Sequence, residues 1–291
     1  MKKTIRFVII PKVAHPWFEE VHQGAKAQAK ILGRELDVNI VVDYMPPSFA
    51  NPEAQKSILE KALITRPQGI ALDPVDSIGN MAVINNIRKQ GVPLVLFDSL
   101  SYDNSITSIG TNFAQQGILA AERLLSLINH TGKVAIMQGY PSAPNHKERY
   151  ESQISILRKY PNVTIIDGGI DNDDIETAYD QAAAVIASNP DLNGYLCCDA
   201  SGPIGIAGAI KAAGKTGKMK IVAMDGIMPI LNAIKEGVID SSSASNPKMQ
   251  GSMSILMLWQ ATLGISTPPL IDTGVVLITQ QNIDSYPAET D

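Results

Sequence analysis

Cysteine is scarce in this sequence of 291 residues. Its two cysteines, Cys197 and Cys198, are neighbours in the chain. A disulfide bond between adjacent residues is strained and cross-links nothing distant. We therefore interpret the pair as two small buried strand residues, and cysteine usage indicates little about the redox compartment.

Positive charge in excess and long hydrophobic runs are also missing. The net charge of −5 argues against a nucleic-acid partner, which requires a basic surface. No stretch of eighteen apolar residues occurs, so we expect no transmembrane helix. The opening MKK is followed by a short apolar run at 5–10 and no small-residue cleavage site, so we interpret 5–10 as a first strand. Either the protein is cytoplasmic, or a signal peptide was removed and an initiator Met added.

Signatures of catalysis are absent as well. The four histidines, at positions 15, 22, 130 and 146, are scattered without metal-ligand spacing, and no G-x-S-x-G or H-E-x-x-H motif occurs. The segment GPIGIAG at 202–208 lacks the spacing of a phosphate or dinucleotide loop, and we attribute its glycines to close helix packing. We expect no metal, no cofactor and no enzyme activity.

Aspartates fall at a distinctive place in the chain. Five short apolar runs end in aspartate, at Asp43, Asp73, Asp98, Asp199 and Asp225. Such runs are typical of strands buried on both faces of a parallel sheet. Ligands of open α/β sheets bind beyond the carboxyl ends of the strands. Carboxylates there would accept hydrogen bonds from a neutral polyhydroxy ligand such as a sugar or polyol.

Strands and helices are predicted to alternate, which indicates the α/β class with parallel sheets. Expected strands lie at 5–10, 38–42, 69–72, 93–97, 133–137, 163–166, 194–198, 220–224, 239–244 and 274–278. Expected helices lie at 17–33, 52–65, 77–90, 113–129, 146–159, 174–188, 203–213, 228–236 and 248–264, and Gly33 is expected to end the first.

The alternation restarts after residue 130, which predicts two similar lobes. The first half stops one strand short of the second, and the late helix and strand could complete either. A chain that crosses between the lobes near 103–112, 243–248 and 270–275 explains this pattern. We expect an N-terminal lobe of 1–107 plus 247–272 and a C-terminal lobe of 108–246 plus 273–291, joined by a hinge that allows closure on a ligand.

Motifs along nearly the whole chain resemble those of one protein family. The opening VIIPKVAHPWFEEVHQGAKAQAKILG, then QGIALDPVDSIGN, GVPLVLFDS, KIVAMDG and SASNPKMQG resemble, in this order and spacing, the ribose-type sugar-binding periplasmic proteins of bacterial ABC importers. The resemblance implies the type I periplasmic-binding-protein fold, two α/β lobes with a three-segment hinge and a cleft between them.

The resemblance also implies roles for particular residues. Trp17 and Phe18 occupy the loop whose aromatic pair stacks on the apolar face of a sugar ring. Phe18 could instead anchor the following helix. Asp98 and Asp225 match the carboxylates of the first and second lobes, which accept charge-assisted hydrogen bonds from hydroxyl groups. The alternative for either is a helix N-cap. For Asp43 and Asp73 we expect a cap or a loop residue, because nothing in the family pattern calls on them.

Further contacts from the second lobe are implied less directly. Asn145 and Arg149 match the family's Asn and Arg, with Lys147 as a substitute for the arginine and a solvated basic face as the alternative. Asp199 lies where the family often has Asn or Asp at a strand end.

Three positions depart from the pattern of pentose binders. His15 stands where they often have Asn, Ser99 where they have Arg, and Ser245 where they have Gln. Serine cannot replace the planar bidentate donor of arginine, so a ribose-identical pocket is not expected. Lys12 and His15 add donors that could favour a sugar acid, a phosphorylated or carbonyl-bearing sugar, or a furanosyl signal molecule. Lys12 could equally pair with a nearby carboxylate.

We therefore expect a monomeric, non-catalytic solute-binding protein that closes on a small carbohydrate and delivers it to an ABC permease. The alternative is a sensor for a furanosyl signal molecule or sugar acid that acts with a membrane receptor. Its expected location is periplasmic or cell-surface anchored. A glycosidase that uses Asp98 and Asp225 is geometrically conceivable but disfavoured by the resemblance. A transcription regulator of this fold would carry a helix-turn-helix ahead of the first strand, and the sequence leaves no room for one.

Overall fold

The chain forms two compact units in a computed structural model that describes residues 2–76, 79–99, 101 and 103–286. Unit 1 comprises Met1–Thr111 and Asn246–Gly274, and unit 2 comprises Asn112–Ser245 and Val275–Asp291. The chain therefore passes from one unit to the other after Thr111, Ser245 and Gly274.

Unit 1 is a parallel sheet with helices on both faces. Its strands, in the spatial order β11-β5-β4-β3-β1-β2, are all parallel. The elements are β1 (Thr4–Ile10), α1 (Pro16–Glu35), β2 (Asn39–Tyr44), α2 (Pro52–Ile64), β3 (Gly69–Leu72), α3 (Met81–Lys89), β4 (Leu94–Phe97), β5 (Thr107–Gly110), α9 (Pro247–Thr262) and β11 (Leu270–Asp272).

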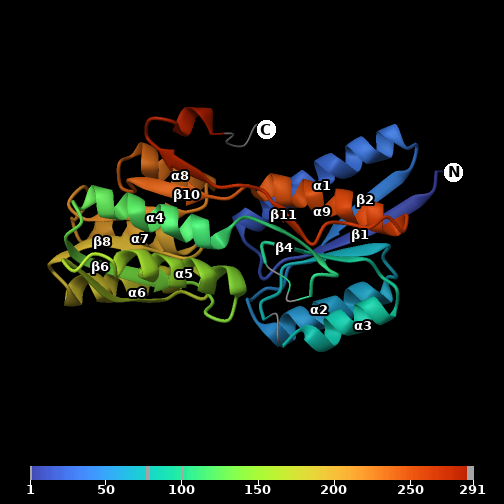
Figure 1. The fold of residues 1–291 in the computed structure, drawn as a ribbon, viewed down its shortest axis with the longest axis horizontal. Helices are drawn as coiled ribbons and strands as arrows, with labels where there is room; N and C mark the ends of the chain where they lie inside the picture. The colour runs from blue at the N-terminus through green and yellow to red at the C-terminus, as the bar shows by residue number, and fades with distance from the viewer. Residues whose placement is uncertain (1, 77–78, 100, 102, 287–291) are drawn as a thin grey trace. The chain divides into compact units, whose positions relative to one another are not determined.

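Helices α1 and α9 pack together on one face of this sheet, and α2 and α3 lie on the other (Figure 1). Two glycines make the α1–α9 contact possible. A Cβ atom at Gly251 would stand 1.8 Å from the carbonyl oxygen of Val21, and one at Gly24 would stand 2.0 Å from that of Lys248. On the opposite face, aliphatic side chains of β1, β3 and β4 form a core with α2 and α3.

Unit 2 repeats the architecture with one change. Its strand order is β12-β10-β9-β8-β6-β7, and only β12 runs antiparallel within the described residues. The elements are α4 (Phe113–Leu127), β6 (Gly132–Gln138), α5 (Pro144–Leu157), β7 (Val163–Ile170), α6 (Ile175–Ser188), β8 (Leu192–Leu196), α7 (Gly202–Ala212), β9 (Lys220–Met224), α8 (Met228–Lys235), β10 (Ser241–Ala244), β12 (Val276–Thr279) and the short 3₁₀ helix η1 (Ile283–Ser285).

Local sequence signals explain many of the helix ends. Asn51, Asn112, Asp174 and Asn246 each cap the following helix by accepting a backbone N–H in its first turn. Proline at the first helical position pre-sets the backbone of α1, α2, α5 and α9.

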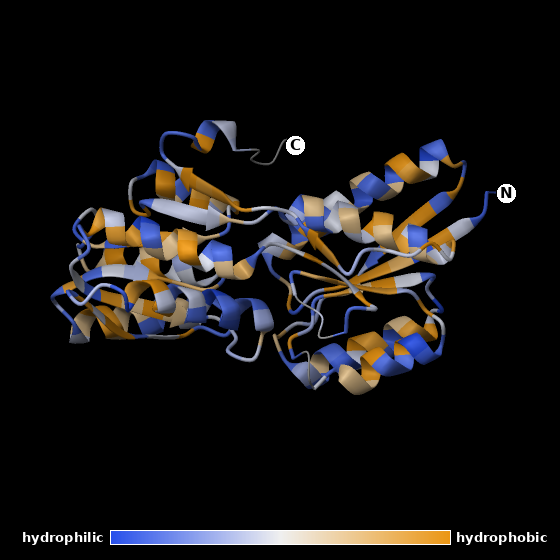
Figure 2. Cartoon of the chain, in the orientation of Figure 1, coloured by the Kyte–Doolittle hydropathy of each residue, from blue (hydrophilic) through white to orange (hydrophobic). Residues whose placement is uncertain are grey.

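Hydropathy follows the same layering. The central strands are predominantly hydrophobic, whereas the helices carry mixed faces (Figure 2). Among the helices that the structure describes, none is both long enough and apolar enough to span a membrane.

The predicted α/β class and the order of its elements are confirmed, but several details are wrong. The first half is not one strand short, because the unpredicted strands β5 and β11 complete its sheet: the sheets described in the two units have six strands each. The predicted last strand is β12, and it belongs to unit 2. Gly33 does not end α1, which continues to Glu35. The helix predicted at 77–90 is observed as Met81–Lys89, and residues 77–78 lie outside the described residues.

The packing of α1 against α9 leads to a prediction. Gly251→Ala should destabilise the protein by about 1–3 kcal/mol, because the new methyl group must push two helix backbones apart. Gly208→Ala in α7 is the control, since its nearest neighbours would be side-chain atoms of Tyr179 at 3.2 and 3.6 Å. Chemical denaturation of both variants measures the effect, and equal midpoints would contradict this account of the interface.

Candidate functional site

Asp98 and Asp225 occupy equivalent positions in the two units. Asp98 directly follows β4, and its N–H donates to the carbonyl oxygen of Ile109 in β5 at 2.8 Å. Asp225 directly follows β9, and its N–H donates to the carbonyl oxygen of Ser243 in β10 at 2.9 Å. These hydrogen bonds fix each aspartate at the carboxyl end of its strand, and both aspartates are buried.

Both aspartates also adopt the same unusual backbone conformation. Their φ angles are +47° for Asp98 and +66° for Asp225. Positive φ is uncommon for residues with a side chain, and asparagine and aspartate tolerate it best. Neither residue caps a helix: the N-cap of α8 is Ile227, and no helix of the described chain begins after Asp98 before α4. The N-cap alternative is therefore wrong for both.

Two glutamines that the sequence analysis did not single out support these aspartates. Gln250 of α9 accepts the N–H of Asp98 at its Oε1 atom, at 2.9 Å. Gln116 of α4 donates from Nε2 to the carbonyl oxygen of Ser243 at 3.0 Å and to Oδ1 of Asp225 at 3.4 Å. Both glutamines are fully buried.

A sequence signal for these glutamines exists. Each lies four residues after the asparagine that caps its helix, Asn112 for Gln116 and Asn246 for Gln250, and each helix begins where the chain enters a new unit. The spacing N-x-x-x-Q occurs at both passages and could have identified the pair.

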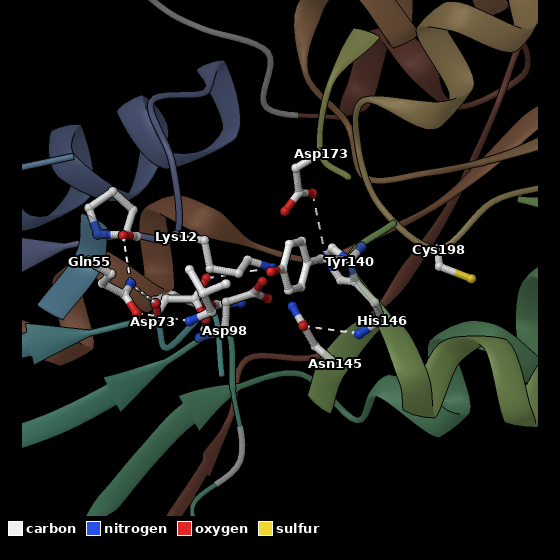
Figure 3. Close-up of polar contacts among 12 residues, drawn as sticks. Lys12, Gln55, Asp73, Asp98, Tyr140, Asn145, His146, Asp173 and Cys198 are labelled. Atoms are coloured by element: carbon white, nitrogen blue, oxygen red, sulfur yellow. Dashed lines mark hydrogen bonds and ion pairs between the residues drawn. The ribbon is translucent and has the colours of Figure 1, made fainter. Parts of the chain in front are cut away.

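Unit 1 also holds a buried ion pair. Lys12, which follows β1, is 1% exposed and has its Nζ 3.7 Å from Oδ2 of Asp73, which is 0% exposed. Gln55 of α2 donates from Nε2 to the carbonyl oxygens of Asp73 at 2.7 Å and of Pro11 at 2.9 Å, so it ties the loops after β3 and β1 together (Figure 3).

The contact between Lys12 and Asp73 bears on the predicted roles of both residues. Of the two predicted roles for Lys12, the structure contains a carboxylate contact, with Asp73. Asp73 is not a helix cap, because α3 begins after Asn80; it is a buried loop residue after β3, as the loop alternative predicted. Asp43 is not a cap either: it lies inside the edge strand β2, with its Oδ2 3.3 Å from Nε of Arg6.

The predicted aromatic residues begin α1 rather than forming a loop. Trp17 and Phe18 are both buried, with ring centroids 5.1 Å apart in an edge-to-face arrangement, and Phe18 also contacts Phe97 of β4. The indole Nε1 of Trp17 is buried without a hydrogen-bond partner within the described part of the chain. His15 is the N-cap of α1, and its Nδ1 accepts the N–H of Trp17 at 3.1 Å.

Ser99 and Ser245 differ in their surroundings. The hydroxyl group of Ser99 is buried and has no hydrogen-bond partner among the described residues. Ser245 donates its hydroxyl to Oδ1 of Asp225, which orients that carboxylate. Ser245 is therefore hydrogen-bonded to the carboxylate of its aspartate, whereas Ser99 is only the neighbour of Asp98 in the sequence.

Helix α5 contributes a second buried cation. Arg149 donates from Nε to Oε1 of Gln116 at 2.8 Å and from Nη1 to the carbonyl oxygen of Cys198 at 3.0 Å, and its guanidinium lies 5.0 Å from the centre of the Phe113 ring. Asn145 is buried near the start of the same helix. A solvated basic face is therefore wrong for Arg149, whereas Lys147 is exposed and faces Glu151.

Asp199 lies three residues beyond β8, at the start of α7. It is 2% exposed, and its Oδ1 accepts the N–H of Gly202 at 3.0 Å. Burial raises the pKa of Asp199 well above its ordinary value. Cys197 and Cys198, just before it, are free and fully buried, and burial also raises the pKa values of their thiols, so they are inert packing residues.

The two groups of side chains have a common chemistry. Carboxylate, amide and hydroxyl groups that are buried and fixed by backbone contacts suit a ligand with many hydroxyl groups. Within residues 2–76, 79–99, 101 and 103–286, no set of three or more His, Cys, Asp or Glu side chains is arranged to hold a metal ion.

The chain is similar to proteins that are named as binding proteins for sugars. The family model described as "Periplasmic binding protein domain" matches residues 6–265. A D-allose-binding periplasmic protein of Escherichia coli (strain K12) is 24% identical over 272 residues, which cover 90% of this chain and 86% of the relative. A D-apiose import binding protein of Actinobacillus succinogenes is 24% identical over 242 residues, covering 82% of this chain and 76% of the relative.

A solved structure extends the comparison. An ABC transporter solute-binding protein from Burkholderia graminis, in complex with D-arabinose, is 27% identical, with a TM-score of 0.91 over 98% of this chain and 99% of that chain.

The role of Gln116 can be tested. Gln116→Ala should lower the free energy of unfolding by about 1–3 kcal/mol for each buried polar group that it leaves without a partner, chiefly at Arg149 and at Ser243. Gln115→Ala, at the exposed neighbouring position, is the matched control. Thermal unfolding of the two variants should separate them clearly, and a wild-type midpoint for both would refute the role.

Proposed function

The chain belongs to the periplasmic binding protein domain family, and on that premise we propose that it is a non-catalytic solute-binding protein for a small carbohydrate. The observation that carries the proposal is the equivalent placement of Asp98 and Asp225, each buried, each at positive φ and each held by the neighbouring strand. A carboxylate fixed in this way accepts hydrogen bonds from two neighbouring hydroxyl groups.

The binding residues that we propose come from both units. Unit 1 would contribute Lys12, His15, Trp17, Phe18, Asp98 and Ser99, and unit 2 would contribute Asn145, Arg149, Asp199, Asp225 and Ser245. Nε1 of Trp17 and the hydroxyl group of Ser99 support this assignment, because buried polar groups usually have a partner and the described residues supply none to either.

The relatives support the ligand class and the partner. Their names and titles refer to D-allose, D-apiose and D-arabinose, and to import and ABC transport. We propose that this protein delivers a monosaccharide or polyol to an ABC permease, as a monomer in the periplasm or anchored at the cell surface.

The ion pair of Lys12 supports a neutral ligand rather than an anionic one. Its ammonium group lies near the Asp73 carboxylate, so the local charges balance without an anion from the ligand. This favours a neutral sugar over a sugar acid or an anionic signal molecule acting with a membrane receptor.

Thermal unfolding against neutral pentoses, hexoses and polyols, and against sugar acids and sugar phosphates, tests this choice. A ligand at 100 times its Kd stabilises by about 2.7 kcal/mol, which moves the midpoint by roughly 2–4 °C per kcal/mol. We expect shifts with one or a few neutral sugars. Shifts with acidic sugars alone would favour the receptor alternative, and no shift with any sugar would reject the carbohydrate assignment.

Substitution of the two aspartates tests the site. Asp98→Asn and Asp225→Asn should each weaken sugar binding at least tenfold, because a charged acceptor becomes a neutral amide and about 1.4 kcal/mol corresponds to tenfold. Asn also tolerates positive φ, so both variants should fold. Asp37→Asn is the matched control: Asp37 has a φ of +54° but is exposed. Near-native affinity in both variants, measured by calorimetry, would show that the site lies elsewhere.

A further inference from the structure

Unit 2 contains a buried pair of carboxyl groups that the proposed function does not explain. Asp171 directly follows β7 and is 0% exposed, and Asp199 follows β8 and is 2% exposed. A Cβ atom at Gly202 would lie 2.9 Å from Oδ2 of Asp171 and 2.9 Å from Oδ1 of Asp199, so both side chains close over the first residue of α7. The two carboxyl groups therefore lie close to each other beside Gly202.

The hydrogen bonds from the backbone account for one oxygen of each group. Oδ1 of Asp171 accepts the N–H of Asp173 at 2.9 Å, and Oδ1 of Asp199 accepts the N–H of Gly202 at 3.0 Å. Oδ2 of Asp171, Oδ2 of Asp199 and the hydroxyl oxygen of Ser201 are buried without a hydrogen-bond partner in the part of the chain that the structure describes. Two adjacent ionised carboxylates without a donor between them would be strongly unfavourable.

The surroundings supply more negative than positive charge. The titratable and charged groups that face the pair are Asp173 and Asp174 from the loop after β7, His146 and Arg149 from α5, and Tyr195, Cys197 and Cys198 from β8 and the segment after it. Arg149 donates to Gln116 and to the carbonyl oxygen of Cys198. Nδ1 of His146 accepts the N–H of Tyr140 at 2.8 Å, and its Nε2 lies 3.7 Å from Oδ1 of Asp173 (Figure 3).

We propose that Asp171 and Asp199 hold one proton between them at neutral pH, so that this wall of unit 2 offers a ligand a carboxylic O–H donor and one negative charge in place of two. The inference rests on the proposed function and adds a residue, Asp171, that determines specificity. An O–H donor matches the ring or carbonyl oxygen of a neutral sugar, which the acceptor-only carboxylates of Asp98 and Asp225 cannot serve.

The direction of the pKa shifts agrees with this geometry. Burial raises the pKa of Asp171 from its ordinary value of 3.8 to about 7, and the pKa of Asp199 is raised as well. Between pH 3.8 and about 7, the folded protein therefore retains a proton that the unfolded chain has lost. The contribution of the pair to stability is complete below pH 3.8 and is lost as the pH rises through about 7.

Carboxyl ¹³C NMR of the ligand-free protein tests the shared proton directly. We expect one aspartate carboxyl resonance that titrates near pH 7 in the wild type and in the control Asp180→Asn, an exposed position on α6, and that is missing from Asp171→Asn. Titration of every aspartate below about pH 5 would overturn the proposal. The wild-type measurement needs no variant, and Asp199→Asn replaces Asp171→Asn if the latter does not fold.

Calorimetry with D-arabinose and D-allose tests the link to binding. The affinity of the wild type should fall by up to about tenfold per pH unit above the titration of the pair, and Asp171→Asn should make the affinity nearly independent of pH there, because its amide donates at every pH. A pH-independent wild-type affinity would refute the specificity role. Absence of binding by either sugar alongside the raised NMR titration would count against these ligands and leave the shared proton standing.

Discussion

The candidate site depends on one backbone hydrogen bond in each unit, which joins the N–H of an aspartate at the end of a strand to a carbonyl oxygen of the next strand. The other polar residues of the site lie around these two aspartates. In each unit the aspartate turns into positive φ directly after its strand, and its N–H is fixed by the carbonyl oxygen of the next strand. A buried glutamine from the helix that enters the unit then completes the contact, Gln250 beside Asp98 and Gln116 beside Asp225. The strained backbone is tolerated because several partners hold it, a situation common at functional sites.

Much of this could be predicted from the sequence, and the reasons differ from element to element. Strands β3 and β9 were predicted with their observed bounds, because short apolar runs between turns have few other uses in a soluble protein. The three residues of β11 carry no such pattern, since they form a strand only by pairing with β5. A glycine such as Gly33 is typical of a helix end, but in the fold it lies inside α1, where a Cβ atom would stand 3.0 Å from the carbonyl oxygen of Val38.

The candidate site also combines residues that the sequence indicates with contacts that only the structure supplies. Residue type and position at a strand end indicate five aspartates, and the family resemblance selects Asp98, Asp199 and Asp225 among them. The partners of Asp73 and Asp171 come from distant parts of the chain, namely Lys12 and Asp199, and no local pattern indicates them. Whether a carboxylate caps a helix, pairs with a cation or shares a proton is set by such long-range neighbours, and only the structure supplies them.

The passage of the chain from unit 1 to unit 2 and back has a consequence for biosynthesis. When the ribosome has released only residues 1–111, the apolar face of α1 has no α9 to cover it and β5 has no β11 beside it. The backbone of Asp98 also waits for Gln250. Domains generally fold as units during synthesis, so unit 2 can acquire most of its structure before unit 1 is complete. The contact that fixes the backbone of Asp98 would thus form after most of unit 2, and α1 would expose its apolar face to chaperones until α9 is synthesised.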